Sequence, residues 1–419
     1  MASVAAQRGT AAGTTEHSGA SGISARARRV TPSATLVIDS KAKALRDAGV
    51  DVISFGAGEP DFPTPTEIVE AAVVACRDPR THRYSPTPGL PELRVEIAAR
   101  TSRSTGVVTS AAQVLVTNGA KHAVANVFTT LLDPGDEVLL AAPYWTTYPE
   151  SIALSDGVPV VVPTDETTGF RARAEDLERH ASDRTKALLF VSPSNPTGAV
   201  YPRDEIEAIG ELARERGWWV ITDEIYEYLV YGDSKHYSMP AVVPDLVDRS
   251  IVISGVSKTF AMTGWRVGWM IGPREVISAA ANIQSHETSN VDNVAQYAAL
   301  AALRADPSIA QEMHAAFDRR RLLAHSLLNA IPGVSSLLTD GAFYAFPSFS
   351  RVLGRSYRGR RPVSTVELAE LVLDELQVAF VPGEAFGAPR YARFSYALAD
   401  DELEEGLARI RKFVESSTD

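Results

Sequence analysis

The sequence predicts an α/β protein with a large domain, built on a mostly parallel sheet flanked by helices, and a smaller α/β domain. Several short segments are apolar at every position and alternate with helical patterns, which is typical of parallel strands covered on both faces. After about residue 305 this alternation stops, and a long helical pattern is followed by short strands and two further helices. That change indicates a second, smaller domain.

Five apolar segments are the expected strands of the large sheet. They end near Val116, Ala141, Val191, Thr222 and Ile253. After the first of them, a turn at Asn118–Gly119 leads into an amphipathic helix that extends to about Leu132. The same strand–loop–helix layout recurs along this half of the chain.

The second half predicts helices at about 309–330, 364–376 and 401–417, with short strands around 378–383 and 392–397. Residues 1–27 are rich in Ala, Gly, Ser and Thr without an apolar period, so we expect a disordered tail there. Residues 28–65 are expected to pack with the small domain, since chain ends often meet. The large domain then covers 66–304 and the small domain 305–419.

The composition excludes several classes of protein. The chain has 419 residues, 45% of them apolar, and a net charge of −11, which suits a globular protein and disfavours nucleic-acid binding. Cys76 is the single cysteine, so no internal disulfide can form. No apolar run reaches the ~18 residues of a membrane span. We therefore expect a cytoplasmic protein with neither nucleic acid nor membrane as a partner.

Polar residues follow the predicted strands where each strand ends. The loops carry Gly119-Ala120-Lys121, Trp145, Asn195, Asp223 and Lys258. In parallel sheets, ligands bind in the crevice outside the carboxyl ends of the strands. We therefore expect these side chains to face one crevice.

Lys258, Asp223 and Arg266 together suit one cofactor, pyridoxal 5′-phosphate (PLP). A lysine amine in an apolar setting loses its proton readily and can form a Schiff base with the aldehyde of PLP. A buried carboxylate such as Asp223 can keep the pyridine nitrogen protonated. The helix start at Gly119-Ala120-Lys121, with Arg266, can bind the phosphate. Singly, Asp223 could be a helix cap and Lys258 a solvated side chain.

The segment "FGAGEP" lacks the third glycine of a dinucleotide site.

The ordered motifs resemble those of class I, fold-type I PLP-dependent aminotransferases, and most closely bacterial aspartate aminotransferases. They are "FGAGEPDFPTP", "HRYSPTPGLPELR", "VTNGAKHA", "PYWTTYPE", "SPSNPTGAVY", "TDEIYEYLVY", "SGVSKTFAMTGWRVGW" and "ARFSYA". The resemblance covers nearly the whole chain after about residue 28. It implies an aminotransferase of amino acid biosynthesis that takes an amino acid donor and a 2-oxo acid acceptor, with 2-oxoglutarate expected as the acceptor.

The resemblance also implies roles for individual residues around the cofactor. Lys258 corresponds to the catalytic Schiff-base lysine, and Asp223 to the partner of the pyridine nitrogen. Tyr226 and Asn195 correspond to the pair that hydrogen-bonds the ring hydroxyl, and Trp145 to the aromatic side chain that stacks on the ring. The phosphate is expected to meet Gly119, Ala120, Ser257 and Arg266.

Further residues are implied for the substrate and for a partner subunit. Arg393 corresponds to the arginine that binds the α-carboxylate, and Gly58 to the glycine whose backbone meets it. Lys121 corresponds to the lysine that reaches the distal carboxylate of aspartate. Tyr84 resembles the tyrosine that reaches the phosphate of the neighbouring subunit, which implies a homodimer with shared active sites. No metal site is expected.

Three positions depart from the family pattern. Gly255 replaces a frequent serine, so Ser257 or Ser254 is expected to substitute for it, and Ala120 replaces a glycine. Glu287 lies in a segment that approaches the partner's site in relatives. Other specificities on this fold therefore stay open: prephenate, aromatic or basic amino acids, or a PLP-dependent oxidase or lyase. A PLP-binding transcriptional regulator is disfavoured by the acidic charge and the short N-terminal segment.

Overall fold

The computed structural model describes residues 22–30 and 34–418, which fall into two compact units divided after Thr31. In the first unit, the described residues contain α1 (Ala25–Arg29), an exposed helix whose first turn is capped by the hydroxyl of Ser24. A disordered tail was predicted for residues 1–27. Residues 1–21 of it lie outside the described residues, and residues 25–27 belong to α1.

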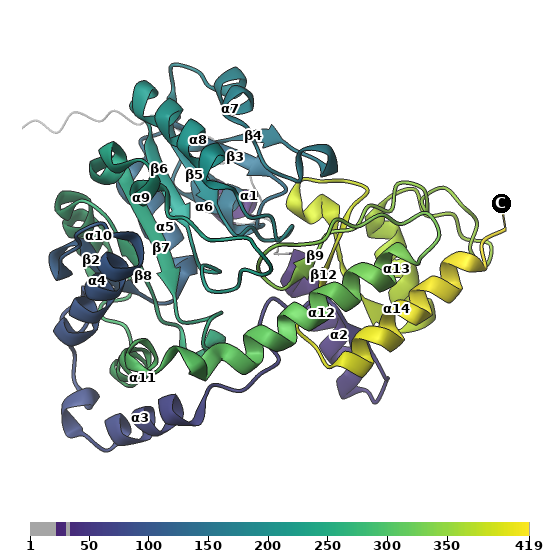
Figure 1. Cartoon of the computed structure of the whole chain (residues 1–419), viewed down its shortest axis with the longest axis horizontal. Helices are drawn as coiled ribbons and strands as arrows, with labels where there is room; N and C mark the ends of the chain where they lie inside the picture. The colour runs from purple at the N-terminus through teal and green to yellow at the C-terminus, as the bar shows by residue number, and fades with distance from the viewer. Residues whose placement is uncertain (1–21, 31–33, 419) are drawn as a thin grey trace, which may run out of the picture. The chain divides into compact units, whose positions relative to one another are not determined.

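A seven-stranded sheet, in the order β2-β8-β7-β6-β5-β3-β4, is the centre of the second unit (Figure 1). Its strands are β2 (Val114–Thr117), β3 (Glu137–Ala142), β4 (Val158–Pro163), β5 (Thr185–Val191), β6 (Trp219–Asp223), β7 (Ser250–Gly255) and β8 (Gly268–Ile271). The five predicted strands are confirmed by β2, β3, β5, β6 and β7. The sheet is parallel except at β8, which runs antiparallel to both β2 and β7.

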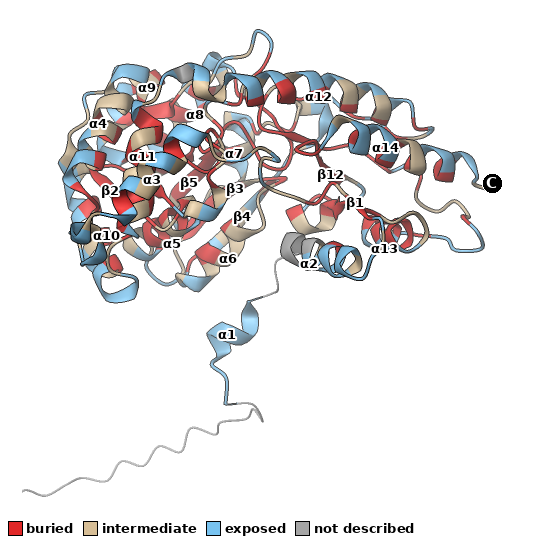
Figure 2. Cartoon of the chain, turned by 90° about the horizontal axis from the view of Figure 1, so that it is seen from below, coloured by how far each residue is buried: buried red, intermediate tan, exposed pale blue. Residues whose placement is uncertain are grey.

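Alternate residues of the strands bury two opposite faces of the sheet. On β3, Val138 and Leu140 pack with α5, α6 and α10, whereas Leu139 packs with α7, α8 and α9 on the other face. Figure 2 shows the buried strands enclosed by helices whose outer faces are exposed. These helices are α5 (Ala120–Leu131), α6 (Thr147–Leu154), α7 (Ala174–His180), α8 (Arg203–Arg216), α9 (Met239–Val242) and α10 (Arg274–Glu287).

A third set of helices packs beside β2 and β8. It comprises α3 (Thr66–Cys76), α4 (Pro91–Thr105) and α11 (Asn293–Arg304). Among the helices of residues 22–30 and 34–418, none is both long and apolar enough to span a bilayer.

The smaller part of this unit has two small sheets, and its core also includes Ile225, Tyr226, Leu229 and Tyr231 from the segment after β6. Its helices α12 (Gln311–Asn329), α13 (Thr365–Leu376) and α14 (Asp400–Glu415) lie close to the predicted ranges, whereas α2 (Ala34–Asp47) was not predicted as a helix. β1 (Ile53–Ser54) pairs parallel with β10 (Val378–Ala379), and β12 (Ala392–Ser395) lies between β11 (Val381–Pro382) and β9 (Tyr344–Ala345). Because β1 pairs with β10, the segment before the large sheet contacts the chain's last third.

Candidate active site

A cavity of about 470 Å³ opens beside the carboxyl ends of the sheet strands. Loops after β3, β5 and β7, the last residue of β6 and the start of α5 line it together with residues from the smaller part. Of the residues predicted from the sequence, the lining includes Gly58, Ala120, Lys121, Trp145, Asn195, Asp223, Tyr226, Ser257, Lys258, Arg266 and Arg393. Residues that are far apart in the sequence thus meet in one place, as the strand-end rule predicted.

Two predicted residues are outside the lining of this cavity. Gly119 lies directly behind it, against the guanidinium of Arg266. Tyr84 is 92% exposed in the chain, so its phenol is not part of the chain's own site. The role predicted for Tyr84, in a partner subunit's site, is therefore not tested by a single chain.

Backbone conformation brings Arg266 onto the turn before α5. Arg266 has a φ of 57°, in the left-handed region, and its guanidinium donates to the carbonyls of Thr263 (2.8 Å) and Asn118 (3.3 Å). Gly119 has a φ of 79°, and a Cβ there would lie 2.4 Å from Nη2 of Arg266, so only glycine fits. The guanidinium and the N–H groups at the start of α5 suit an anionic ligand, and residues 118–121 with Arg266 are called the anion-binding turn for this reason.

Asp223 is buried at the end of β6, with 2% of its surface exposed. Its Oδ1 accepts from the backbone N–H of Ile225 at 3.1 Å, and its Oδ2 accepts from the hydroxyl of Tyr148 at 2.9 Å. Burial raises the pKa of Asp223 to about 6, although both hydrogen bonds act in the opposite direction. A carboxylate with this surrounding favours a cationic N–H partner in the cavity.

Lys258 lies on the loop after β7, and its Nζ donates to the carbonyl of Gly58. Burial lowers the pKa of Lys258 to about 8, and the charges of Arg393 and Arg266 act in the same direction. The lowered pKa makes the neutral amine, which a nucleophile or a proton acceptor requires, far more accessible near neutral pH than it is for an exposed lysine.

Arg393 is buried in β12, with 2% of its surface exposed. It donates to Oδ1 of Asn195 at 3.1 Å and to the carbonyl of Gly56 at 2.7 Å, whereas its Nε has no hydrogen-bond partner. Both acceptors are uncharged. Arg393 forms no ion pair with any of the described residues 34–418. A buried guanidinium without a counter-charge suits an anionic ligand, because an unpaired buried charge is costly.

The two residues predicted to hydrogen-bond the ring hydroxyl have partners within the chain. The Tyr226 hydroxyl lies 2.8 Å from that of Tyr344, and Asn195 is engaged by Arg393. Sequence reasoning missed Tyr344 and Tyr148, both of which line the cavity. Tyr148 stands three positions after Trp145 at the start of α6, and this helical spacing could have indicated it. No local pattern identifies Tyr344, which reaches the site from β9.

Lys121 and Trp145 form one wall of the cavity, with Nζ of Lys121 5.0 Å from the centre of the indole ring. Burial and the neighbouring Arg266 lower the pKa of Lys121. Glu287, at the end of α10, does not line this cavity; its carboxylate lies 3.6 Å from Nε2 of His122. Within the chain's own site, therefore, Lys121 faces the ligand space and Glu287 does not.

The departures around Gly255 have a steric explanation. A Cβ at Gly255 would lie 3.0 Å from both the carbonyl oxygen of Val267 and Cα of Gly268 in the neighbouring strand. Ser254 donates its hydroxyl to Glu227 at 2.9 Å, whereas Ser257 lines the cavity. Ser257 is thus the serine that the fold offers to a ligand.

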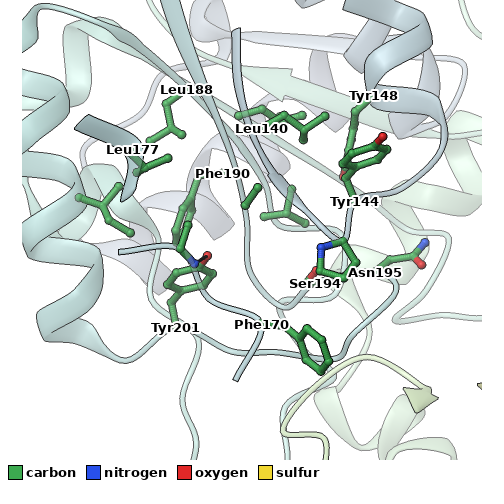
Figure 3. A pocket seen from close by; sticks show the side chains of 16 residues that line it. Leu140, Tyr144, Tyr148, Phe170, Leu177, Leu188, Phe190, Ser194, Asn195 and Tyr201 are labelled. Carbon is green, nitrogen blue, oxygen red and sulfur yellow. Dashed lines mark hydrogen bonds between the residues drawn. The ribbon is translucent and has the colours of Figure 1, made fainter. Parts of the chain in front are cut away.

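Two neighbouring features lie outside the cavity. One is a small space of about 30 Å³, with room for a single water, and Tyr148 and Asn195 line both it and the main cavity. Figure 3 shows the side chains that surround this space. Glu224, Glu227 and His236 form the one group of metal-type donors found among the described residues. Glu224 is already engaged by Thr222, Ser238 and His236, whereas Nδ1 of His236 is buried without a hydrogen-bond partner.

The fold and site together define an α/β enzyme whose cavity presents a reactive amine and cationic groups to an anionic ligand. The chain belongs to the aminotransferase class I and II family, whose model matches residues 50–410. The resemblance predicted from the motifs is therefore confirmed, and the chain is an aminotransferase.

Individual relatives extend over nearly the whole chain. It is 59% identical over 397 residues to an aspartate aminotransferase of Streptomyces avermitilis, covering 95% of this chain and 97% of that relative. The crystal structure of an aspartate aminotransferase from Rhizobium meliloti has a TM-score of 0.91 at 36% identity, covering 94% and 99% of the two chains. An aspartate aminotransferase from Thermus thermophilus with maleate has a TM-score of 0.88 at 39% identity, with the same coverages.

Proposed function

We propose that this aminotransferase is PLP-dependent and transfers the amino group of aspartate to 2-oxoglutarate by a ping-pong mechanism. The observation that carries the proposal is Arg393, a buried guanidinium with no counter-charge, in the cavity that also holds the Lys258 amine with its lowered pKa. A substrate α-carboxylate would supply the missing charge. The name of the relative at 59% identity supports aspartate over the other specificities that the sequence left open.

The residues of the cavity fit PLP. The anion-binding turn matches the phosphate, Asp223 matches a protonated pyridine nitrogen, and the amine of Lys258 matches the aldehyde. When bound, PLP supplies an electrophilic carbon and a ring that withdraws electrons from the substrate's α-carbon. Trp145 and Ser257 line the cavity where the ring and the phosphate would lie.

The protein's own groups would then orient the substrate and move protons. Arg393 binds the α-carboxylate and fixes the orientation of the α-carbon relative to Lys258. The Nζ amine of Lys258 would accept the proton of the substrate's α-carbon and carry it within the site. The carboxylate of Asp223, which Tyr148 orients, would stabilise a protonated pyridine nitrogen if PLP were bound.

Aspartate and 2-oxoglutarate both carry a second carboxylate, for which Lys121 is the available cation. Its Nζ lies at the cavity wall beside Trp145, and it forms no ion pair with the described residues. We also propose a homodimer with shared sites, because the exposed phenol of Tyr84 has no role in its own chain's cavity. A cytoplasmic location stays a prediction.

The experiment is a half-reaction panel with the PLP-loaded enzyme. Aspartate, glutamate, phenylalanine and arginine are added singly, and the absorbance of the bound cofactor is followed. We expect aspartate and glutamate to convert it fastest and 2-oxoglutarate to reverse the change. Faster conversion by phenylalanine or arginine would overturn the dicarboxylate specificity, and no change with any donor would overturn the proposed reaction.

A further inference from the structure

The peptide group of Asn118, at the start of the anion-binding turn, is held on both sides. Its carbonyl accepts from Nη2 of Arg266 at 3.3 Å, and its N–H donates to Nδ1 of His122 at 3.2 Å. His122 lies in the first turn of α5, one residue after Lys121. The imidazole therefore fixes the orientation of a peptide whose other end is fixed by the cation of the same turn.

The second nitrogen of the His122 ring is buried and lacks a hydrogen-bond partner. It lies 3.6 Å from Oε2 of Glu287, which is the last residue of α10 and is 49% exposed in its side chain. α5 and α10 are joined nearby by a hydrogen bond of 2.9 Å between the buried amides of Asn126 and Gln284. The two helices are thus fixed in register, and the Glu287 carboxylate is the nearest anion to the ring.

The contact with Asn118 requires a particular protonation state. Nδ1 must be unprotonated to accept from the Asn118 N–H, so the proton of the neutral ring is on Nε2, toward Glu287. A protonated ring would place an N–H donor against the Asn118 donor. Burial lowers the pKa of His122 and the carboxylate of Glu287 opposes this, so the neutral ring is favoured at neutral pH.

Charged groups around the ring come from three elements. Glu287 faces it from α10, Lys121 precedes it on α5, and Arg266 lies on the far side of the Asn118 carbonyl. The two cations both oppose protonation of His122, and Glu287 favours it. Burial lowers the pKa of His122 and Glu287 opposes it, so Glu287 is the part of this balance that a single substitution can remove.

We propose that His122 is a positioning residue of the anion-binding turn, and that Glu287 sets the pH at which it releases that turn. The inference rests on the proposed PLP function, because the phosphate is the ligand of the turn. Neutral His122 holds the Asn118 peptide so that the next N–H groups face the phosphate. Acidification that protonates His122 breaks this hydrogen bond and weakens binding of a phosphorylated ligand.

The test measures the affinity of the full-length, cofactor-free protein for PLP and for pyridoxal, which lacks the phosphate, from about pH 5.5 to about pH 8.5. Three variants are compared with the parent chain. His122→Gln keeps an acceptor and a donor but does not titrate, His122→Leu has neither, and Glu287→Gln removes the carboxylate. Circular dichroism at each pH shows whether the fold is retained.

We expect His122→Leu to bind PLP roughly two- to tenfold more weakly at pH 8.5, the worth of one hydrogen bond, with pyridoxal affinity unchanged. The parent chain should lose PLP affinity in acid relative to His122→Gln, since the phosphate's own titration is common to both. In Glu287→Gln the loss should shift to lower pH, because the group that raises the pKa of His122 is gone.

Equal PLP affinities and pH profiles in the parent, His122→Gln and His122→Leu would overturn the inference. So would equal losses of PLP and pyridoxal affinity, which indicate a general structural defect. If the parent chain binds neither compound, the proposed function itself fails, and this outcome is distinct from the others.

Discussion

Two buried arginines of this chain are held in opposite ways. Arg320, on α12, is 6% exposed and donates to the carboxylates of Asp61 at 2.9 Å and Asp400 at 2.6 Å. Arg393, on β12, is 2% exposed and donates to uncharged oxygens, with its Nε unpartnered. The first guanidinium joins three segments of the protein, whereas the second is oriented by its neighbours but not neutralised.

The difference separates a structural cation from a ligand-binding one. Transfer of a charge out of water is costly, and nearby carboxylates offset that cost for Arg320. For Arg393 the offset has to come from outside the chain, which is why we assign it to a substrate carboxylate. The lowered pKa values of Lys258 and Lys121 have related causes, since both amines are desolvated and lie near other cations.

The largest effect is expected from Lys258→Met, which removes the cavity's amine while keeping an apolar side chain of similar length. Turnover should fall by at least ~10³-fold, because the nucleophile and the proton carrier are both removed. The visible absorbance of covalently held PLP should disappear as well. Steady-state kinetics and a spectrum test this, with the exposed Lys412→Met as the control. Turnover near the parent's would refute the assignment.

Arg393→Leu is expected to weaken substrate binding without weakening the fold. Charge-assisted hydrogen bonds are worth ~1.5–3 kcal/mol each, so KM for aspartate should rise by ~10–10² for each such bond removed. Removal of an unpaired buried charge should leave the urea midpoint of the cofactor-free protein unchanged or higher. A clear drop in stability would show that Arg393 is a structural cation like Arg320.

Arg320→Leu is the matched change on the other side of the comparison. It leaves the carboxylates of Asp61 and Asp400 without their partner, which should lower the free energy of unfolding by ~1–3 kcal/mol. The effect is moderated because both carboxylates are partly exposed and can be hydrated. Urea unfolding measures it. If the free energy of substrate binding changes by more than the free energy of unfolding, the contrast between the two arginines fails.

Lys121→Leu should have the smallest effect and a selective one. It removes the cation nearest the expected distal carboxylate, so kcat/KM for aspartate should fall roughly tenfold. The value for alanine, which has no second carboxylate, should stay within about threefold of the parent's. Parallel kinetics with both donors decide the point, and an equal decrease for the two substrates would remove Lys121 from the specificity.

A local rule predicted much of the site. The apolar runs of the strands can be recognised in the sequence, and the carboxyl ends of parallel strands meet at one edge of the sheet. This rule brings together Lys258, Asp223, Asn195 and Trp145. Arg266 was placed by its motif and not by periodicity. Its left-handed backbone, which turns the guanidinium onto Gly119, is not encoded by a residue type that favours that conformation.

Other features depend on contacts that no local pattern reveals. Tyr344 meets Tyr226 across 118 positions of sequence, and Arg320 meets Asp61 across 259. The antiparallel direction of β8 is likewise a property of the whole sheet, since an apolar run shows that a strand exists but not which way it pairs.

The central claim is that Arg393 and Lys121 together bind two carboxylates. Isothermal titration of the PLP-loaded enzyme with maleate, a dicarboxylate without an amino group, tests this directly because no reaction can follow. We predict that the parent chain and Arg320→Leu bind maleate with similar affinity, while Arg393→Leu and Lys121→Leu each bind it at least ~tenfold more weakly. Equal maleate affinity in all four proteins would contradict the account.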